Sequence, residues 1–224
     1  MGLFYLVRHG ETDWNKNGLC MGQLDIPLNA IGIKQAERLA ARLCKIKVDA
    51  IYASDLSRAA QTAQIIATMI QRKPVFLKEL REIYLGAYQG LSSEGVRDKF
   101  PSAYLIPSGS LAQQNELNEP EIENRTKLYH RVVPIFEKML KDHQHERVTV
   151  VTHGGVMRCL MNYVLGRSSN HNESIFYSTA VDCSNCSITL VRIEPDGRPK
   201  LVGINDTAHL DLLLDESIDA RDFG

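Results

Sequence analysis

Apolar residues along the chain follow two alternating patterns, short continuous runs and longer stretches with helical spacing. Continuous runs that are too short for helices predict buried strands, and they cover residues 2–7, 48–53, 74–77 and 148–152. Stretches in which apolar residues recur three or four positions apart predict amphipathic helices, and they cover residues 33–46, 56–70, 121–143 and 156–165. The last of the apolar runs is β-branched throughout, so we expect it at the centre of a sheet.

Turn residues and caps predict where these elements end. Ser54 and Asp55 are expected to cap the helix that follows them, and Pro134 is expected to bend the helix that contains it. The polar segment 11–32 is long enough to suggest a functional loop, and the irregular segment 90–119 predicts a short helix before an exposed cover. The remaining expected elements are strands at 174–181, 187–193 and 200–204 and a loosely held acidic tail from Asp206.

The alternation of strands and helices, without an internal repeat or a linker, predicts one α/β domain over residues 1–224. The expected architecture is a three-layer sandwich, in which a mostly parallel central sheet carries helices on both faces. The segment around residues 90–120 is expected to be an insertion that covers part of this domain.

Composition narrows the functional classes. The chain has 224 residues, of which 44% are hydrophobic and 24% charged, and its formal net charge is −1. This balance, without a basic stripe, argues against a nucleic-acid partner. No apolar run is long enough to span a bilayer and no basic segment precedes an apolar one near the N-terminus, so we expect a cytoplasmic protein without a membrane partner. The cysteines are odd in number and scattered, and Cys183 and Cys186 lack zinc ligands nearby in sequence, so we expect neither disulfides nor a metal site.

Candidate chemistry begins at the end of the first predicted strand, with Arg8, His9 and Gly10. Arginine presents a rigid fork of donors that matches phosphate oxygens, histidine is a nucleophile near neutral pH, and glycine lets the backbone approach a ligand. Taken alone, an Arg-His pair at a strand end is as consistent with a structural position as with a phosphate site. The motif is therefore a hypothesis that depends on its context.

Three further clusters lie at strand ends or in loops, and they are Arg58, Glu82 and the pair His153-Gly154. Arg58 falls in the first turn of a predicted helix, where the helix dipole favours an anion. Each cluster also has an ordinary explanation, as a surface helix residue, a loop carboxylate or a hydrogen-bonded strand-end histidine. If the preceding strands lie side by side, however, their carboxyl ends converge on one cleft with two arginines, two histidines and a carboxylate.

The same residues lie in sequence blocks that resemble the histidine phosphatase superfamily, the phosphoglycerate-mutase-like proteins. The blocks are LVRHGETDWN at residues 6–15, GQLDIPL at 22–28, GIKQA at 32–36, SDLSRAAQTA at 54–63, LREI at 80–83 and VTHGGV at 151–156. They occur in the family's order and are spread over most of the chain, which makes the resemblance specific.

The resemblance implies a two-step phosphoryl transfer through a phosphohistidine. His9 would attack phosphorus through one neutral ring nitrogen while a hydrogen bond holds the other. Arg8 and Arg58 would clamp the non-bridging oxygens, each charge-assisted bond contributing on the order of 1.5–3 kcal/mol. His153, expected to be protonated, would add a donor. Glu82, expected to start protonated, would protonate the leaving oxygen and then activate water.

The resemblance also implies which residues contact the substrate. Asn15, Gly22 and Gln23 match loop positions that bind substrate or phosphate in the family, and Gly154 is expected to lend a backbone N–H. The implied reaction needs neither a metal nor another cofactor, and the expected partner is a small-molecule phosphate ester. The chain departs from the family's F-G-x-W-E-G pattern with LGAYQG at residues 85–90, a change that concerns the rim of the pocket and substrate preference.

Phosphatases and mutases share this core, so the segment between Glu82 and His153 has to separate them. Cofactor-dependent phosphoglycerate mutases, which the chain resembles, carry a longer insertion there that is rich in Arg, Lys and Tyr and excludes water. In this chain residues 102–119 contain no Arg or Lys, so we favour a phosphomonoesterase for a small phosphorylated metabolite. A mutase and a non-catalytic phospho-ligand-binding protein are the alternatives, and the sequence leaves a homodimer open as a further partner.

Overall fold

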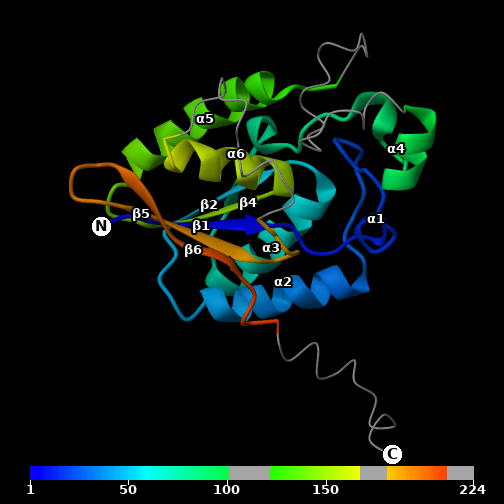
Figure 1. Cartoon of the computed structure of the whole chain (residues 1–224). Helices are drawn as coiled ribbons and strands as arrows, with labels where there is room; N and C mark the ends of the chain where they lie inside the picture. The colour runs from blue at the N-terminus through cyan, green and yellow to red at the C-terminus, as the bar shows by residue number, and fades with distance from the viewer. Residues whose placement is uncertain (101–121, 167–180, 211–224) are drawn as a thin grey trace, which may run out of the picture.

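The computed structural model describes residues 1–100, 122–166 and 181–210, and these residues build a six-stranded sheet (Figure 1). In spatial order the strands are β3 (Pro74–Leu77), β2 (Ala50–Ser54), β4 (Arg147–Thr152), β1 (Leu3–Arg8), β5 (Ile188–Ile193) and β6 (Pro199–Asp206). The first four run parallel to one another, whereas β5 runs antiparallel to both of its neighbours, β1 and β6. The predicted mostly parallel sheet is therefore confirmed, and the β-branched strand β4 lies in its interior between β2 and β1.

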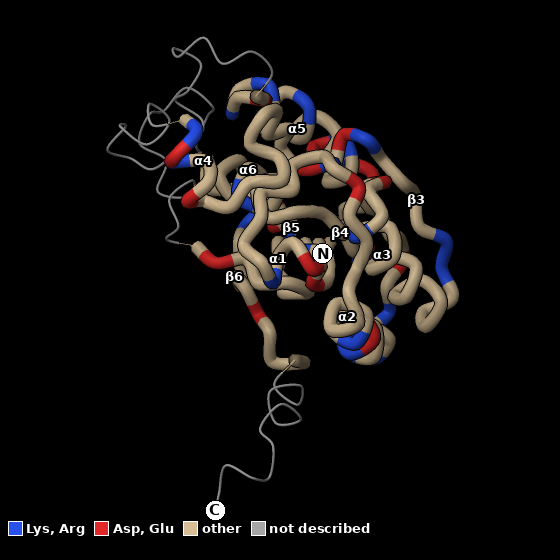
Figure 2. Tube along the Cα trace, turned by 90° about the vertical axis from the view of Figure 1, so that its right-hand side faces the viewer, with Lys and Arg blue, Asp and Glu red and all other residues tan. Residues whose placement is uncertain are grey.

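Helices cover both faces of this sheet (Figure 1). They are α1 (Asp13–Lys16), α2 (Ala30–Leu43), α3 (Ser57–Ile70), α4 (Ser93–Lys99), α5 (Arg125–Asp142) and α6 (Gly154–Val164), with the 3₁₀ turns η1 (Lys78–Leu80) and η2 (Gly86–Tyr88) after β3. Because α5 and α6 lie over one face and α2 and α3 over the other, the predicted three-layer arrangement is confirmed. Figure 2 shows β3 at one margin of the molecule and residues of both charges on α2.

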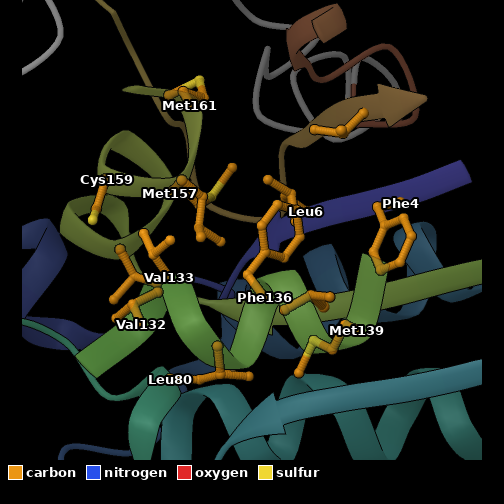
Figure 3. Packing of buried hydrophobic residues seen from close by; sticks show 14 of the residues in the cluster. Phe4, Leu6, Leu80, Val132, Val133, Phe136, Met139, Met157, Cys159 and Met161 are labelled. Atoms are coloured by element: carbon orange, nitrogen blue, oxygen red, sulfur yellow. The ribbon is translucent and has the colours of Figure 1, made fainter. Parts of the chain in front are cut away.

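The two helical layers pack on the sheet with side chains of different size. Under α5 and α6 the contacts are made by large side chains, and Phe4 of β1 packs edge-on against Phe136 of α5 with ring centroids 5.6 Å apart. Figure 3 shows these rings among their neighbours from both helices. Under α2 and α3 small residues such as Ala36 and Ala59 pack beside Leu39. Both faces of the central strands are therefore buried.

Two predicted helix starts are wrong by a few residues, because asparagines cap at other positions. α2 begins earlier than expected, at Ala30, since Asn29 Oδ1 accepts a hydrogen bond at 2.8 Å from a backbone N–H of the first turn. α5 begins later than expected, at Arg125, since Asn124 caps it in the same way. Pro134 lies inside α5, which continues through it as one helix.

The predicted caps of α3 are also wrong. The N-cap is Leu56, which has no side-chain acceptor. Ser54 Oγ instead accepts from Leu56 N and lies 2.9 Å from His153 Nε2, and the Asp55 carboxylate accepts two hydrogen bonds from Arg81. Both polar side chains therefore serve contacts between strands and loops, which local sequence does not show.

Some predicted segments lie outside the described residues, namely most of the strand at 174–181, the cover within 101–121 and the tail from 211. The start of the tail needs a correction. Asp206 ends β6 and accepts hydrogen bonds from both terminal nitrogens of Arg42 on α2, the Nη1 bond at 2.9 Å. This contact lowers the pKa of Asp206 to about 2. The chain is thus anchored where it was expected to be loose.

Candidate active site

Three predicted site clusters lie at the carboxyl ends of adjacent strands. Arg8 is the last residue of β1, Arg58 follows β2 in the first turn of α3, and His153 separates β4 from α6. Arg8 pairs in register with Thr152, the last residue of β4, and the rings of His9 and His153 have centroids 5.1 Å apart. The side-by-side arrangement of these strands, assumed from the sequence, is therefore confirmed.

One ring nitrogen of His9 is fixed by a hydrogen bond. Nδ1 lies 2.7 Å from the Gly10 carbonyl oxygen, and because a carbonyl can only accept, Nδ1 carries the proton and Nε2 the lone pair. Burial, and then the charges of Arg8 and Arg58, hold the pKa of His9 well below its ordinary value of 6.5. At neutral pH His9 therefore presents an unprotonated Nε2, as a nucleophile requires.

Gly10 lies where the loop after β1 meets α2 and α3. A Cβ at this position would come within 2.5 Å of the Gly32 carbonyl oxygen, so only glycine lets the two backbones approach. The Gly10 N–H donates to Thr62 Oγ1 at 3.0 Å, and the Thr62 hydroxyl donates to the Arg58 carbonyl at 2.8 Å. The glycine and the threonine of the sequence blocks thus tie the His9 backbone to the helix that carries Arg58.

Arg58 is fully buried, and the protein binds its guanidinium on several sides. Nη1 and Nη2 donate to the carbonyl oxygens of Leu24 and Gly22, each at 2.8 Å, and Nε donates to His153 Nδ1 at 3.3 Å. Burial lowers the pKa of Arg58 to about 10, although the charge of Glu82 opposes the shift. Arg58 therefore fastens the loop that contains Gly22, and contact between its remaining N–H groups and a phosphate stays a prediction.

Arg8 reaches the site from the end of β1. Its Nη1 donates to the Cys183 carbonyl oxygen at 2.6 Å, whereas its Nε is buried and has no hydrogen-bond partner within the described ranges. Burial lowers the pKa of Arg8, with Glu82 opposing the shift. Gly154, the first residue of α6, lies against this guanidinium, since a Cβ there would be 3.8 Å from Arg8 Nε. A buried donor without a partner, beside a helix N-terminus, is a ready site for an anion.

Glu82 is held by backbone donors. Its Oε1 accepts from Ile83 N at 2.8 Å and its Oε2 from Gly155 N at 3.1 Å, which brings the carboxyl group to the N-terminus of α6. A Cβ at Gly155 would lie 2.4 Å from Oε1, so a side chain at this position would displace the carboxyl group. Gln23 Nε2 donates to the Glu82 carbonyl oxygen at 2.9 Å. The carboxyl group that the sequence placed in a loop thus lies beside the anion site.

The prediction that His153 is protonated is wrong. Burial, and then the charges of Arg58, His9 and Arg8, hold the pKa of His153 well below 6.5. Nδ1 accepts from Arg58 Nε, so the proton of the neutral ring sits on Nε2 and is donated to Ser54 Oγ at 2.9 Å. In this structure His153 therefore orients Arg58 and does not present a charged donor. The sequence could not show this, because the burial and the surrounding positive charge come from other elements.

The predicted substrate residues fall into two groups. Gly22 and Gln23 make hydrogen bonds to Arg58 and to the backbone of Glu82, and Gly154 lies beside the guanidinium of Arg8. Asn15 is instead part of the capping box of α1, and its Oδ1 also accepts from Asn185 Nδ2 at 3.3 Å. Contact between these residues and a substrate stays a prediction.

Sequence reasoning missed the turn at residues 183–186, which braces the end of β1. Asn185 Nδ2 donates to the His9 carbonyl oxygen at 2.9 Å, and Cys186 N donates to the Arg8 carbonyl oxygen at 3.0 Å. The spacing of the two cysteines drew attention to their thiols, whereas the contacts are made by the backbone and the asparagine. In the part of the chain that the structure describes, no group of three or more His, Cys, Asp or Glu residues could hold a metal ion.

Comparisons with known proteins identify relatives of the chain. The sequence profile described as "Histidine phosphatase superfamily (branch 1)" matches residues 4–207. Phosphoglycerate mutase-like protein 4 of Arabidopsis thaliana is 39% identical over 180 residues, which are 79% of this chain and 76% of that protein. A metal-independent phosphoserine phosphatase of the same plant is 41% identical over 167 residues, which are 73% of this chain and 69% of that protein.

A solved structure agrees with the fold. Mycobacterial glucosyl-3-phosphoglycerate phosphatase in complex with VO3 matches with a TM-score of 0.78 and 26% identity, covering 91% of this chain and 99% of that one. Among the helices of the described residues, none is long and apolar enough to cross a membrane. Location in the cytoplasm and assembly with a second copy stay predictions.

Proposed function

The chain belongs to the histidine phosphatase superfamily and is a phosphoric monoester hydrolase, and on this basis we propose that it hydrolyses small phosphate esters through a phosphohistidine on His9. One observation carries the proposal. The hydrogen bond from Nδ1 to Gly10 leaves Nε2 of His9 unprotonated, next to Arg8, whose buried Nε has no partner among the described residues. A nucleophile and an available hydrogen-bond donor for a phosphate oxygen are thus combined at the end of β1.

In the first step, the Nε2 lone pair of His9 attacks phosphorus in line with the ester oxygen. The P–O bond breaks as the P–N bond forms, and the departing oxygen takes a proton from Glu82. Arg8 and Arg58 hold the non-bridging oxygens, because phosphoryl transfer depends mainly on positioning and charge stabilisation. The bond from Nδ1 to the Gly10 carbonyl stabilises the positive charge that the phosphorylated ring acquires.

In the second step, Glu82 takes a proton from water, whose oxygen attacks phosphorus and displaces Nε2 of His9. The P–N bond breaks, inorganic phosphate leaves, and Glu82 has regained the proton that the next turnover needs. His153 is a positioning residue in this scheme, because its neutral ring accepts from Arg58 Nε. Side chains of the chain itself fill every role in both steps.

The site also suggests a substrate class. Arg158 lies on α6 beside Arg8, with its Nη1 3.2 Å from the position of a Cβ on Gly154. Arg158 adds a third cation, after Arg8 and Arg58, next to the phosphate position, and this favours esters that carry a carboxylate near the phosphate. The names of two relatives specify phosphoserine and glucosyl-3-phosphoglycerate, which are both esters of this kind. We therefore expect a phosphorylated small carboxylic acid as substrate.

A substrate panel tests function and class together. Phosphoserine and 3-phosphoglycerate are compared with phosphoethanolamine and glycerol phosphate, which lack the carboxylate, and both phosphate release and isomerisation are followed. We expect phosphate release, fastest from the carboxylates, and a rise of KM by about tenfold for those substrates alone in Arg158→Gln, as loss of one charge-assisted bond predicts. Isomerisation of 3-phosphoglycerate without phosphate release would instead identify a mutase.

A further inference from the structure

The loop that delivers Glu82 is anchored by a residue from another layer. Residues 79–84 form only the end of η1 and irregular backbone, so their position depends on contacts made by other elements. Arg131, on α5, donates through Nη1 to the carbonyl oxygens of Glu79 at 2.7 Å and Arg81 at 2.9 Å, and through Nη2 to that of Glu82 at 3.3 Å. One guanidinium thus gathers three carbonyl groups of this loop.

Glu123 fixes the orientation of that guanidinium. Its carboxylate accepts from Arg131 Nε at 2.8 Å and from Nη2 at 2.7 Å, and the two side chains are only 11% and 22% exposed. The same carboxylate accepts from Tyr84 N at 3.1 Å, and Glu123 N donates to the Tyr84 carbonyl at 2.8 Å. The pair therefore holds the loop both before and after Glu82.

We propose that Arg131 and Glu123 are positioning residues that set where the Glu82 carboxyl group stands relative to the phosphate site. Glu82 reaches the start of α6 through a hydrogen bond of 3.1 Å from Gly155 N, so a small shift of its backbone carries the proton away from the leaving oxygen. A misplacement of about 1 Å costs on the order of 10²-fold in rate. This inference rests on the proposed role of Glu82 as the general acid and base.

The contacts require an arginine at this position. Its planar fork aligns two bonds with the carboxylate of Glu123 while the outer N–H groups reach the carbonyl oxygens of the loop. A lysine has the same charge but a single donor centre, so it cannot hold both partners in this alignment. Arg131→Lys therefore separates the orientation of the loop from the charge of residue 131.

The dependence on leaving group distinguishes positioning of the acid from a general structural role. An alkyl ester leaves as a strongly basic oxygen and needs a proton from Glu82, whereas 4-nitrophenolate is weakly basic and needs little help. The ratio kcat/KM reports the steps up to phosphorylation of His9, so it excludes the later attack of water. Loss of a well-placed acid lowers kcat/KM for the alkyl ester alone.

The test compares Arg131→Gln, Arg131→Lys and Glu123→Gln with Glu82→Gln on the best alkyl phosphate of the panel and on 4-nitrophenyl phosphate. Arg192→Gln is the matched control, since Arg192 also makes two bonds to a carboxylate, that of Glu194, but on β5. We expect the Arg131 and Glu123 variants to lose about tenfold or more in kcat/KM for the alkyl ester and less than about threefold for the aryl ester. The control should retain both activities.

Two outcomes overturn the inference. In one, the Arg131 variants fold but lose the same factor on both esters, while Glu82→Gln shows the selective loss. In the other, Arg131→Lys keeps full activity on the alkyl ester. If Arg131→Gln does not fold, Arg131→Lys and Glu123→Gln decide by the same ratio. Failure of the proposed function is visible separately, because Glu82→Gln itself would then lack the selective loss.

Discussion

Arginines of the phosphate site and arginines paired with a carboxylate carry the same charge in different surroundings. In the paired group, Arg42 and Arg81 each donate two hydrogen bonds to one carboxylate, and those bonds raise the pKa of both guanidinium groups. At the site, Arg8 and Arg58 are bound by carbonyl oxygens and a neutral ring. Burial lowers the pKa of both.

The difference shows which arginines keep a positive charge that no carboxylate neutralises. A guanidinium paired with a carboxylate is neutralised as a pair and serves to hold elements together. A buried guanidinium surrounded by neutral acceptors stays a local positive charge, and it attracts an anion that enters the site. This arrangement costs stability at the site, because Arg8 Nε is buried without a hydrogen-bond partner among the described residues.

The largest expected effect is on kcat/KM, when one arginine of the phosphate site and one arginine paired with a carboxylate are each replaced by glutamine. Arg8→Gln removes the bond to the Cys183 carbonyl oxygen and the buried Nε donor that has no partner among the described residues, so we expect kcat/KM to fall by about 10²-fold, from charge-assisted bonds to phosphate of about 1.5–3 kcal/mol each. Arg42→Gln, which breaks the contacts with Asp206 and His209, should leave kcat/KM unchanged. Steady-state kinetics measures kcat/KM of both variants, and circular dichroism checks that both are folded like the wild type. Equal losses in both variants would remove the distinction.

A smaller effect is expected in the dependence of stability on pH. His9 and His153 are neutral when folded, because burial lowers the pKa of both, but they take up protons below about pH 6.5 when unfolded. The unfolded state then binds more protons, so the free energy of unfolding falls as the pH falls through 6.5, by up to about 1.4 kcal/mol per pH unit for each histidine.

Urea unfolding between about pH 7.5 and about pH 5.5 measures this slope. His153→Asn should make the slope shallower, while His145→Asn, at an exposed position before β4, should leave it unchanged. A slope that is the same in wild type and His153→Asn would show that the buried ring is not held neutral.

The smallest effect is expected at the periphery. The pKa of Asp206 is lowered from 3.8 to about 2 by the hydrogen bonds from Arg42, so this pair stabilises the fold above pH 3.8 and the contribution is lost as the pH falls towards 2. Because the side chains are about two-fifths exposed, we expect Asp206→Asn to lower the free energy of unfolding by less than about 1 kcal/mol at neutral pH. Activity should not change, and a loss of activity would extend the site to this edge.

Residues at strand ends could be predicted from the sequence, for a physical reason. Arg8, His9 and His153 directly follow apolar runs, and in a parallel sheet the order of the chain sets which ends meet. The charge of His153 could not be predicted, because it depends on burial among groups from other elements. The sequence around residue 110 is polar and without periodicity, so there it supports only a coarse expectation.

Residues that bind the backbone of other segments could not be predicted from the sequence, for a different reason. Arg131 and Asn185 bind carbonyl oxygens, and every residue carries one, so no side-chain pattern identifies the partner. Their positions on α5 and in the turn at 183–186 looked like ordinary helix surface and strand start. Only the tertiary structure shows that they hold the loops of Glu82 and His9.

Rapid-quench trapping of the phosphoenzyme tests the central claim most directly. Protein mixed with 4-nitrophenyl phosphate is quenched within one turnover and the phosphorylated residue is located by mass spectrometry. The account predicts an acid-labile, alkali-stable phosphoryl group on His9, absent from His9→Ala and accumulating in Glu82→Gln, where the attack of water lacks its base. Turnover with no phosphoryl group on His9 in either wild type or Glu82→Gln would contradict it.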